Sequence, residues 1–269
     1  MKSLNLLNKD SNPKTIKGQK QGYKTAVLYL APSSLTWQAY SSSPKKFRQD
    51  FKKRYGFHLP TQASQYLKKN ICPFAKIEGC LNDCLNKAGR GAFDSIQWAR
   101  ALKTAFYLTR PEQFKEYIKH ELKTYIDKND KNGFKTAFRL NGTSDLRELE
   151  FIREVQDMGA IGYDYSKDFR KWQENTNEEY SLTFSIQNRL DFHRWKNSPK
   201  MGNCAIVTRG GLFDPCLAEL PDFKGVHFVD GDEHDLRFLD PQGKFCVVLK
   251  AKGPARKSES TFIVNNWEK

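Results

Sequence analysis

"FKTAFRLNGTSD", residues 134–145, begins with apolar residues and ends with polar ones, and the repetition of this pattern decides the fold. Short apolar runs separated by roughly 10 to 20 residues are typical of β/α units that build a mostly parallel sheet. The pattern recurs in five later segments: GAIGYDYSKDF (159–169), YSLTFSIQ (180–187), NCAIVTRGG (203–211), GVHFVDGDEHD (225–235) and KFCVVLKAKG (244–253).

Upstream of this region, TAVLYLAP (25–32) predicts a further buried strand that ends at a proline. Two helices are predicted after it, one from Asp94 to about Leu108 and one from Pro111. About seven strands with short later connections favour an α/β fold, a partial open (β/α) barrel of mostly parallel strands in one domain over residues 1–269. The first helix has Phe93, Ile96, Trp98, Ala101 and Ala105 as partial core positions, and in the second Phe114, Ile118, Leu122 and Tyr125 recur at helical spacing.

The composition is that of a globular chain, because 38% of its 269 residues are hydrophobic. The longest apolar stretch, around residues 26–31, is far shorter than the roughly 20 residues that span a bilayer. The N-terminus also lacks the apolar core of a signal peptide. We therefore expect a protein of a reducing cytoplasm with no membrane partner, where clustered cysteines bind metal or perform redox chemistry more often than they form disulfides.

Three of the six cysteines fall in one predicted loop, NICPFAKIEGCLNDCLNKAGRGAF (70–93). Cys72, Cys80 and Cys84 follow the pattern C-x7-C-x3-C, and three thiolates in one loop can converge on one metal centre. A structural zinc site takes four ligands, whereas three cysteines suit a [4Fe–4S] cluster with one iron left open. The spacing favours the cluster, with structural zinc and ordinary free thiols as the alternatives.

The residues around this loop and the other cysteines carry different expectations. Arg90 follows the cysteines within AGRGAF, where it can meet a carboxylate or phosphate. Cys204 and Cys246 lie inside apolar strands and are predicted to be small core residues. Cys216 is ambiguous, and it is not assigned as a fourth ligand.

The basic residues are concentrated at one end of the chain. Residues 1–70 hold 14 Lys and Arg against two acids, while the whole chain has a net charge of +14. A local basic field attracts polyanions, nucleic acid first among them. The basic stretch lies in an apparent insertion, 33–69, where Phe47, Phe51 and Tyr55 can stack on bases or pack on the barrel. The candidate phosphate-binding residues are Lys45, Lys46, Arg48, Lys52, Lys53 and Arg54. The alternative is a solubilising, partly mobile arm.

Polar residues at the carboxyl ends of the predicted strands are candidates for a site, because parallel sheets build sites at that edge. Lys167, Asp164 and Asp145 could form an acid/base set, with a solvated lysine and ordinary loop polarity as the alternative. Ser185 lies at the end of another predicted strand on the same rim.

A second cluster of acids lies between Asp230 and Asp235. Carboxylates at Asp230, Asp232 and Asp235 can share a divalent cation, as in a metal-dependent nuclease. The sequence D-G-D also forms a simple turn, and the turn is the favoured interpretation. Asp235 is also expected to pair with Arg237 across this turn.

Several quoted blocks together resemble a family of phage-encoded proteins labelled gene-product-3-like. The resemblance covers about residues 14–264 and implies a viral or prophage origin without specifying a reaction. The blocks that carry it are TIKGQKQGYKTAVLYLAP, CPFAKIEGCLNDCLNKAGRGAF, AFRLNGTSDL, YDYSK, LTFS and GDEHDLRFLDPQGKFCVVLKAKGPARK.

The order of strand, cysteine loop, helix and strand also resembles the radical-SAM superfamily, whose usual cysteine spacing, C-x3-C-x2-C, differs from the spacing here. This resemblance implies that Cys72, Cys80 and Cys84 hold a [4Fe–4S] cluster that binds S-adenosylmethionine (SAM). It also implies a SAM contact at the end of the second strand, around Gly142. The expected cofactor-binding residues are Arg90, Asn141, Gly142, Thr143 and Ser185.

The function expected from the sequence is a phage-encoded, radical-SAM-like iron–sulfur enzyme in the cytoplasm of an infected or lysogenic host. Its substrate would be a nucleotide, a nucleic acid or another phage-related molecule, and a host reductase would be a partner. The alternatives are a phage nucleic-acid-binding protein with a structural zinc site and a metal-dependent nuclease that uses the Asp230–Asp235 turn.

Overall fold

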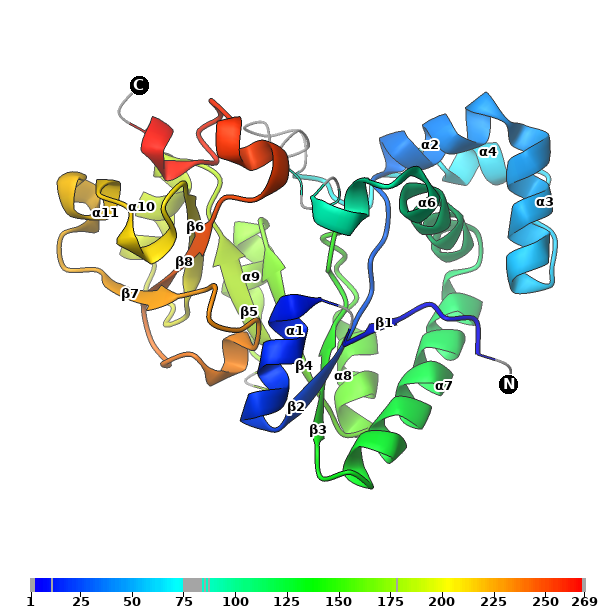
Figure 1. The fold of residues 1–269 in the computed structure, drawn as a ribbon, viewed down its shortest axis with the longest axis horizontal. Helices are drawn as coiled ribbons and strands as arrows, with labels where there is room; N and C mark the ends of the chain where they lie inside the picture. The colour runs from blue at the N-terminus through cyan, green and yellow to red at the C-terminus, as the bar shows by residue number, and fades with distance from the viewer. Residues whose placement is uncertain are drawn as a thin grey trace.

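The fold is built on one eight-stranded sheet, seen edge-on and curved in the computed structural model of Figure 1. The structure describes residues 3–10, 12–74, 84, 86, 88–177 and 179–267. The strand order is β1-β2-β3-β4-β5-β6-β8-β7, and every neighbouring pair is parallel except β1 with β2. The strands are β1 (Asn8–Lys9), β2 (Tyr23–Val27), β3 (Lys135–Arg139), β4 (Ala160–Ser166), β5 (Ser181–Ser185), β6 (Cys204–Thr208), β7 (His227–Asp230) and β8 (Phe245–Lys250).

From β2 to β6 the order in the sheet follows the order in the chain, so each crossover moves in the same direction. Right-handed crossovers that all move one way place their helices on a single face of the sheet. Helices α7 (Pro111–Asp130), α8 (Leu149–Asp157), α9 (Phe169–Glu174) and α10 (Arg189–Asn197) follow this rule and contribute to the main core. The predicted α/β fold with an open, mostly parallel sheet is therefore confirmed, and the expected strands are present.

The sequence pattern missed only β1 among these strands. This strand has two residues, Asn8 and Lys9, and neither is apolar, so no alternation marked it. It pairs antiparallel with β2 and forms one edge of the sheet, while β7 forms the other.

The face of the sheet opposite the main core is covered by α1 (Pro13–Gly18) and by the turn that follows β7. Leu236 is fully buried there in a small core with Ala137 and Tyr163. A Cβ atom on Gly18 would lie 3.1 Å from the Leu236 side chain, so the absence of a side chain lets α1 approach this close. This second core leaves no open barrel interior at that position.

Residues 33–69 form a helical lobe of α2 (Ser33–Ser42), α3 (Pro44–Tyr55) and α4 (Ala63–Tyr66), which packs on α6 (Asp94–Thr109). Phe47 and Phe51 have no exposed surface and belong to the main core. Because these rings are buried, the hypothesis that they stack on bases is wrong, and the packing alternative is confirmed. The remaining described helices are α11 (Cys216–Glu219) and the 3-10 helices η1 (Gln19–Gln21), η4 (Gly89–Ala92), η5 (Gly211–Phe213), η6 (Pro221–Phe223), η7 (Arg237–Leu239), η8 (Gly253–Lys257) and η9 (Val264–Asn266).

The two long helices test the predicted core positions. In α7 all four expected residues are buried, as are Ala101 and Ala105 in α6. Phe93 and Ile96, expected as partial core positions, are instead 61% and 38% exposed; they lie at the N-cap and in the first turn of α6. Cys204 and Cys246 are fully buried opposite each other on β6 and β8, which confirms them as core residues.

Candidate functional site at the carboxyl edge of the sheet

The parallel strands end together at the upper edge of the sheet in Figure 1, and the segments that follow them meet there. The segment that leads to Cys72 is attached at this edge, because the Asp145 N–H donates to the Ile71 carbonyl at 3.0 Å. Farther along the chain, Ala88 lies against η8, after β8. A Cβ atom on Gly253 would lie 3.0 Å from the Ala88 Cβ atom.

Cys72 and Cys84 are half-buried at this edge, while Cys80 lies outside the described residues. The Cys84 sulfur accepts a hydrogen bond from the Asn86 N–H at 3.4 Å. The same Asn86 binds the Arg100 guanidinium through its Oδ1 atom at 2.6 Å. An N–H donor to the sulfur and a nearby guanidinium are surroundings that suit a cysteine that ligates metal.

These two cysteines alone do not make a metal site. Within the described ranges, no group of three His, Cys, Asp or Glu side chains is arranged to hold a metal ion. A three-thiolate site therefore depends on Cys80 in addition to Cys72 and Cys84. The surroundings of Cys84 fit a cluster or zinc ligand in their chemistry, and they do not distinguish between the two.

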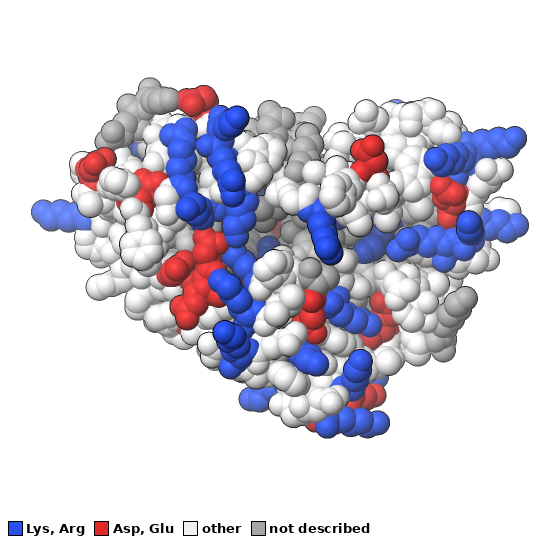
Figure 2. Space-filling model, in the orientation of Figure 1, with Lys and Arg blue, Asp and Glu red and all other residues white. Residues whose placement is uncertain are grey.

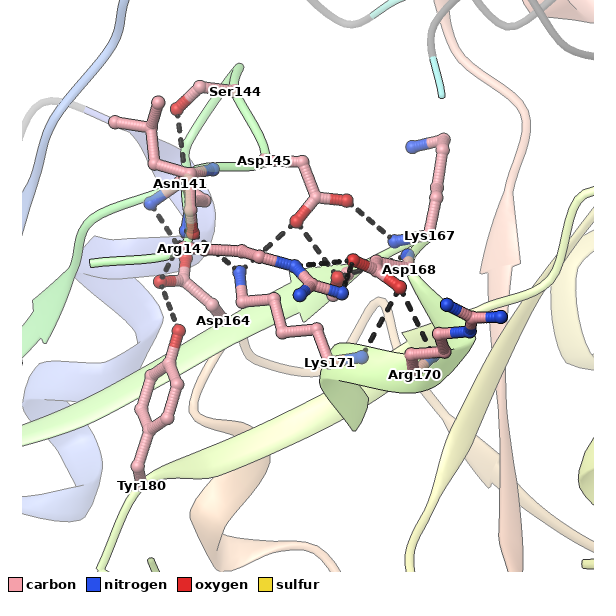
Figure 3. Close-up of polar contacts among 12 residues, drawn as sticks. Asn141, Ser144, Asp145, Arg147, Asp164, Lys167, Asp168, Arg170, Lys171 and Tyr180 are labelled. Atoms are coloured by element: carbon pink, nitrogen blue, oxygen red, sulfur yellow. Dashed lines mark hydrogen bonds and ion pairs between the residues drawn. The ribbon is translucent and has the colours of Figure 1, made fainter. Parts of the chain in front are cut away.

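The predicted acid Asp164 lies inside the protein, at the end of β4, with no exposed surface. Its Oδ1 atom accepts from the Asn141 N–H at 2.8 Å, and its Oδ2 atom accepts from the Tyr180 hydroxyl at 3.0 Å (Figure 3). Burial raises the pKa of Asp164 to about 6. These contacts join the ends of β3 and β4 and leave the carboxylate no access to a substrate.

Asp145 is also held by internal partners. Its carboxylate accepts from the Ser166 hydroxyl at 2.8 Å, the Lys167 N–H at 2.8 Å and the Lys171 ammonium at 3.1 Å. In Figure 3 the Lys167 side chain extends away from this carboxylate, and its ammonium lies 5.7 Å from the centre of the Phe262 ring. The structure thus brings the three predicted acid/base residues to neighbouring positions but does not aim their side chains at one point.

The side chains of Asn141 and Thr143 form hydrogen bonds that connect the segments after β2 and β3. The Asn141 Oδ1 atom accepts from the Leu146 N–H at 2.7 Å, and the Thr143 hydroxyl donates to the Leu30 carbonyl at 2.6 Å. A Cβ atom on Gly142 would lie 2.7 Å from the Leu28 carbonyl oxygen, so glycine is required for the close approach of two backbones. These side chains therefore have partners within the fold.

The other two expected cofactor-binding residues keep exposed surface at the same edge. Ser185 is half-buried at the end of β5, and Arg90 is exposed in η4. Their side chains are therefore accessible to a bound molecule.

The three aspartates of the 230–235 turn have separate partners. Asp230 Oδ1 accepts from the Asp232 N–H at 2.8 Å, which is the turn that the sequence favoured. Asp232 Oδ1 lies 2.9 Å from the Lys14 ammonium and 2.8 Å from that of Lys252. Their contacts are those of a structural turn rather than of a shared cation site.

The Asp235 side chain lies on the face of the sheet that carries the small core of Leu236, Ala137 and Tyr163. Its Oδ2 atom is 3.0 Å from Arg139 Nη1 and accepts from the Tyr163 hydroxyl at 3.1 Å. Arg237 Nη1 instead lies 3.2 Å from Asp240 Oδ2, so the expected pairing of Asp235 with Arg237 is wrong. The turn folds back over β3 and β4, which brings Asp235 to Arg139, and adjacent residues in the turn face different partners.

The candidate phosphate-binding residues lie on α3, at the right of Figure 2, where Lys and Arg side chains project from this face. Arg48 is engaged internally, since its guanidinium donates to the carbonyls of Leu59 and Pro60 at 3.0 Å. The remaining five candidates are exposed: Lys45, Lys46, Lys52, Lys53 and Arg54.

Two ion pairs near the edge, one buried and one partly buried, were not found from the sequence. One joins Lys171 with Asp145, and the other joins Arg139 with Asp235. Lys171 lies in α9, where a lysine in a short polar helix is normally exposed. No pattern marked it as a partner of a residue 26 positions earlier.

This structure defines the protein as an open, singly wound α/β protein in which Cys72 and Cys84 lie at the carboxyl edge of the sheet. The chain belongs to a phage protein family, described as Gene product 88, whose model matches residues 5–266. The predicted phage family resemblance is confirmed over nearly the whole chain, although the label gene-product-3-like was wrong. The comparisons give no support to the resemblance to the radical-SAM superfamily.

Comparison with curated proteins and comparison with solved structures each give no match. In the part of the chain that the structure describes, no helix has both the length and the apolar character needed to cross a bilayer.

Proposed function

We propose that this phage protein is an iron–sulfur enzyme of the radical-SAM type, with Cys72, Cys80 and Cys84 as the cluster ligands. The observation that carries the proposal is the position of the cysteine segment. Its first described end is attached to the end of β3 through Ile71 and Asp145, and at its other described end Ala88 lies against Gly253, after β8. Both ends therefore lie at the carboxyl edge, where parallel sheets build sites.

A cluster with one open iron would bind SAM and deliver the electron for its reductive cleavage, with a host reductase as the electron source. The protein's own residues would contribute ligands and polar contacts. Asn86 donates to the Cys84 sulfur, and hydrogen bonds to cluster sulfurs tune reduction potential. Among the expected cofactor-binding residues, Asn141 and Thr143 are hydrogen-bonded within the fold. Ser185 and Arg90 have exposed surface and are the ones that can contact a ligand.

The acid/base role of Asp164 and Asp145 is not part of this proposal, because both carboxylates are buried against structural partners. Lys167 is the remaining candidate of that set, since its ammonium lies near Phe262 at the edge. The contacts of the Asp230–Asp235 turn also favour the enzyme at the cysteine edge over the metal-dependent nuclease.

The test is anaerobic purification followed by iron, sulfide and zinc analysis and an ultraviolet–visible spectrum. About four irons and four sulfides per chain are expected in the wild type. Both should be lost in Cys72→Ala and Cys84→Ala and kept in Cys216→Ala, whose cysteine is buried in α11. SAM cleavage by the reduced protein is the second measurement.

Two outcomes would overturn the proposal. Zinc without iron would leave the alternative of a structural site in a nucleic-acid-binding protein. Absence of both metals from anaerobically prepared protein would mean that the three cysteines hold no metal centre.

A further inference from the structure

The two faces of α3 differ sharply in chemistry. Phe47, Phe51 and Tyr55 form the buried face, with at most 4% of any of them exposed. Four exposed lysines occupy the opposite side in two pairs, each separated by seven residues or about 10.5 Å along the helix axis. We call Lys45, Lys46, Lys52 and Lys53 the lysine stripe. Because α3 spans only Pro44–Tyr55, the stripe runs along most of the helix.

The positive charge of this lobe is almost uncompensated. Residues 33–69 contain eight Lys and Arg but one acid, Asp50. The Asp50 carboxylate accepts from the Trp98 indole at 3.0 Å and so faces α6. The Lys46 ammonium lies 5.3 Å from the centre of the Trp98 ring. Among the described side chains, no carboxylate lies within ion-pair distance of the four lysines.

We propose that the lysine stripe of α3 binds the phosphodiester backbone of a nucleic acid duplex, without reading its sequence. The other face of α3 is used for packing, so this row of exposed cations is free to attract a polyanion. Lysine ammonium groups bind phosphates as point charges. Base stacking is excluded for the α3 aromatics by their burial, so contacts from this stripe are to the backbone.

The position of the lobe relates the stripe to the candidate site. The lobe lies between β2 and Cys72 in the chain, and both of its connections are anchored near the carboxyl edge. The Ala31 N–H donates to the Thr104 hydroxyl at 2.9 Å, and the Ile71 carbonyl accepts from Asp145 at 3.0 Å. The inference that a duplex is the substrate rests on the proposed enzyme, whereas binding of the duplex by α3 does not.

The experiment measures binding of a fluorescein-labelled 24-base-pair DNA duplex by anisotropy as the salt concentration rises. The test variant is Lys45→Glu with Lys52→Glu and Lys53→Glu. The matched control is Lys20→Glu with Lys131→Glu and Lys224→Glu, which makes the same change in net charge on exposed lysines outside the lobe. Thermal unfolding of each variant checks that the fold is intact.

The α3 variant is expected to bind at least about tenfold more weakly, and its slope of log K against log salt should be smaller by roughly 2.7. The control variant should lose much less affinity at the same salt. Equal losses in the two variants would overturn the proposal, because they would show a general charge effect. Tighter binding to a single strand or to anionic vesicles than to the duplex would also overturn it.

The two proposals fail separately. Cys72→Ala is expected to lose metal and keep duplex affinity, while the α3 variant should lose affinity and keep its metal. Absence of metal with duplex binding intact would therefore remove the enzyme and leave the α3 surface in place.

Discussion

The Lys171 ammonium lies 3.1 Å from Asp145 Oδ1, and both side chains are almost completely buried at the carboxyl edge of the sheet. Lys171 also donates to the Leu146 carbonyl at 2.7 Å, and Asp145 accepts from Ser166 and from the Lys167 N–H. The pair therefore joins β3, β4 and α9 at the point where the segment toward Cys72 is attached. A residue predicted to be catalytic has a structural partner that the sequence did not indicate.

Replacing Asp145 with alanine should lower the free energy of unfolding by about 3–5 kcal/mol, because it leaves the Lys171 charge buried without a partner. Urea unfolding measures this loss. The control is Arg147→Ala, which removes a half-exposed ion pair with Asp168 and should cost less than about 1 kcal/mol. Similar losses in the two variants would show that the Lys171–Asp145 pair is not the anchor described here.

The pH dependence of stability should reveal the raised pKa of Asp240. Burial raises the pKa of Asp240 to about 6, so its ionised form is disfavoured in the folded state. Between an ordinary value near 3.9 and about 6 the folded protein binds more protons, and this group stabilises the fold more as pH falls. Asp240→Asn removes this titrating carboxyl and keeps a side chain of the same size beside Arg237.

The measurement is the difference in unfolding free energy between wild type and Asp240→Asn from pH 7 to pH 4. It should shift in favour of the wild type as pH falls through about 6, by up to about 3 kcal/mol. A difference that is constant over this range would contradict the raised pKa.

Asp232→Ala should weaken the attachment of α1 to the turn after β7. The carboxylate contacts Lys14 and Lys252 and accepts from the Lys250 N–H at 2.7 Å. We expect a loss of about 1–2 kcal/mol in low salt, smaller at high salt because the site is partly exposed. Although burial opposes ionisation, hydrogen bonds from Lys252 and Lys14 lower the pKa of Asp232.

Because this pKa is depressed, the contribution of Asp232 should be present above about pH 4 and lost as pH falls below it. The variant should therefore approach wild-type stability in acid, as measured by thermal unfolding. A Mg²⁺-dependent nuclease activity that the substitution abolishes would instead support the cation site.

Substitutions on the two faces of α3 should differ strongly in their effect on the free energy of unfolding. Phe51→Ala removes a fully buried ring from the core and should cost about 3–5 kcal/mol. Lys52→Ala, at the next position on the exposed face, should change stability by less than about 0.5 kcal/mol. Chemical denaturation of both variants tests this, and a comparable cost at Lys52 would mean that the lysine stripe is structural.

The sequence by itself predicted the parallel strands, because apolar runs that end in polar residues reflect burial at each strand and solvent at the edge. It also predicted α7, where the 3.6-residue period of Phe114, Ile118, Leu122 and Tyr125 matches the buried face. The grouping of Cys72, Cys80 and Cys84 is a property of the sequence too, since their spacing requires no long-range folding.

Only the tertiary structure decided which polar residues are free to act. Asp164 and Asp145 are like other strand-end acids in the sequence, and their burial follows from Tyr180 and Lys171, which lie 16 and 26 positions away. Phe51 is equally suited by sequence to a base or a core, and the packing of α3 on α6 selects the core. Local patterns record which faces are apolar, but the partner of a buried charge is fixed by which strands and helices become neighbours.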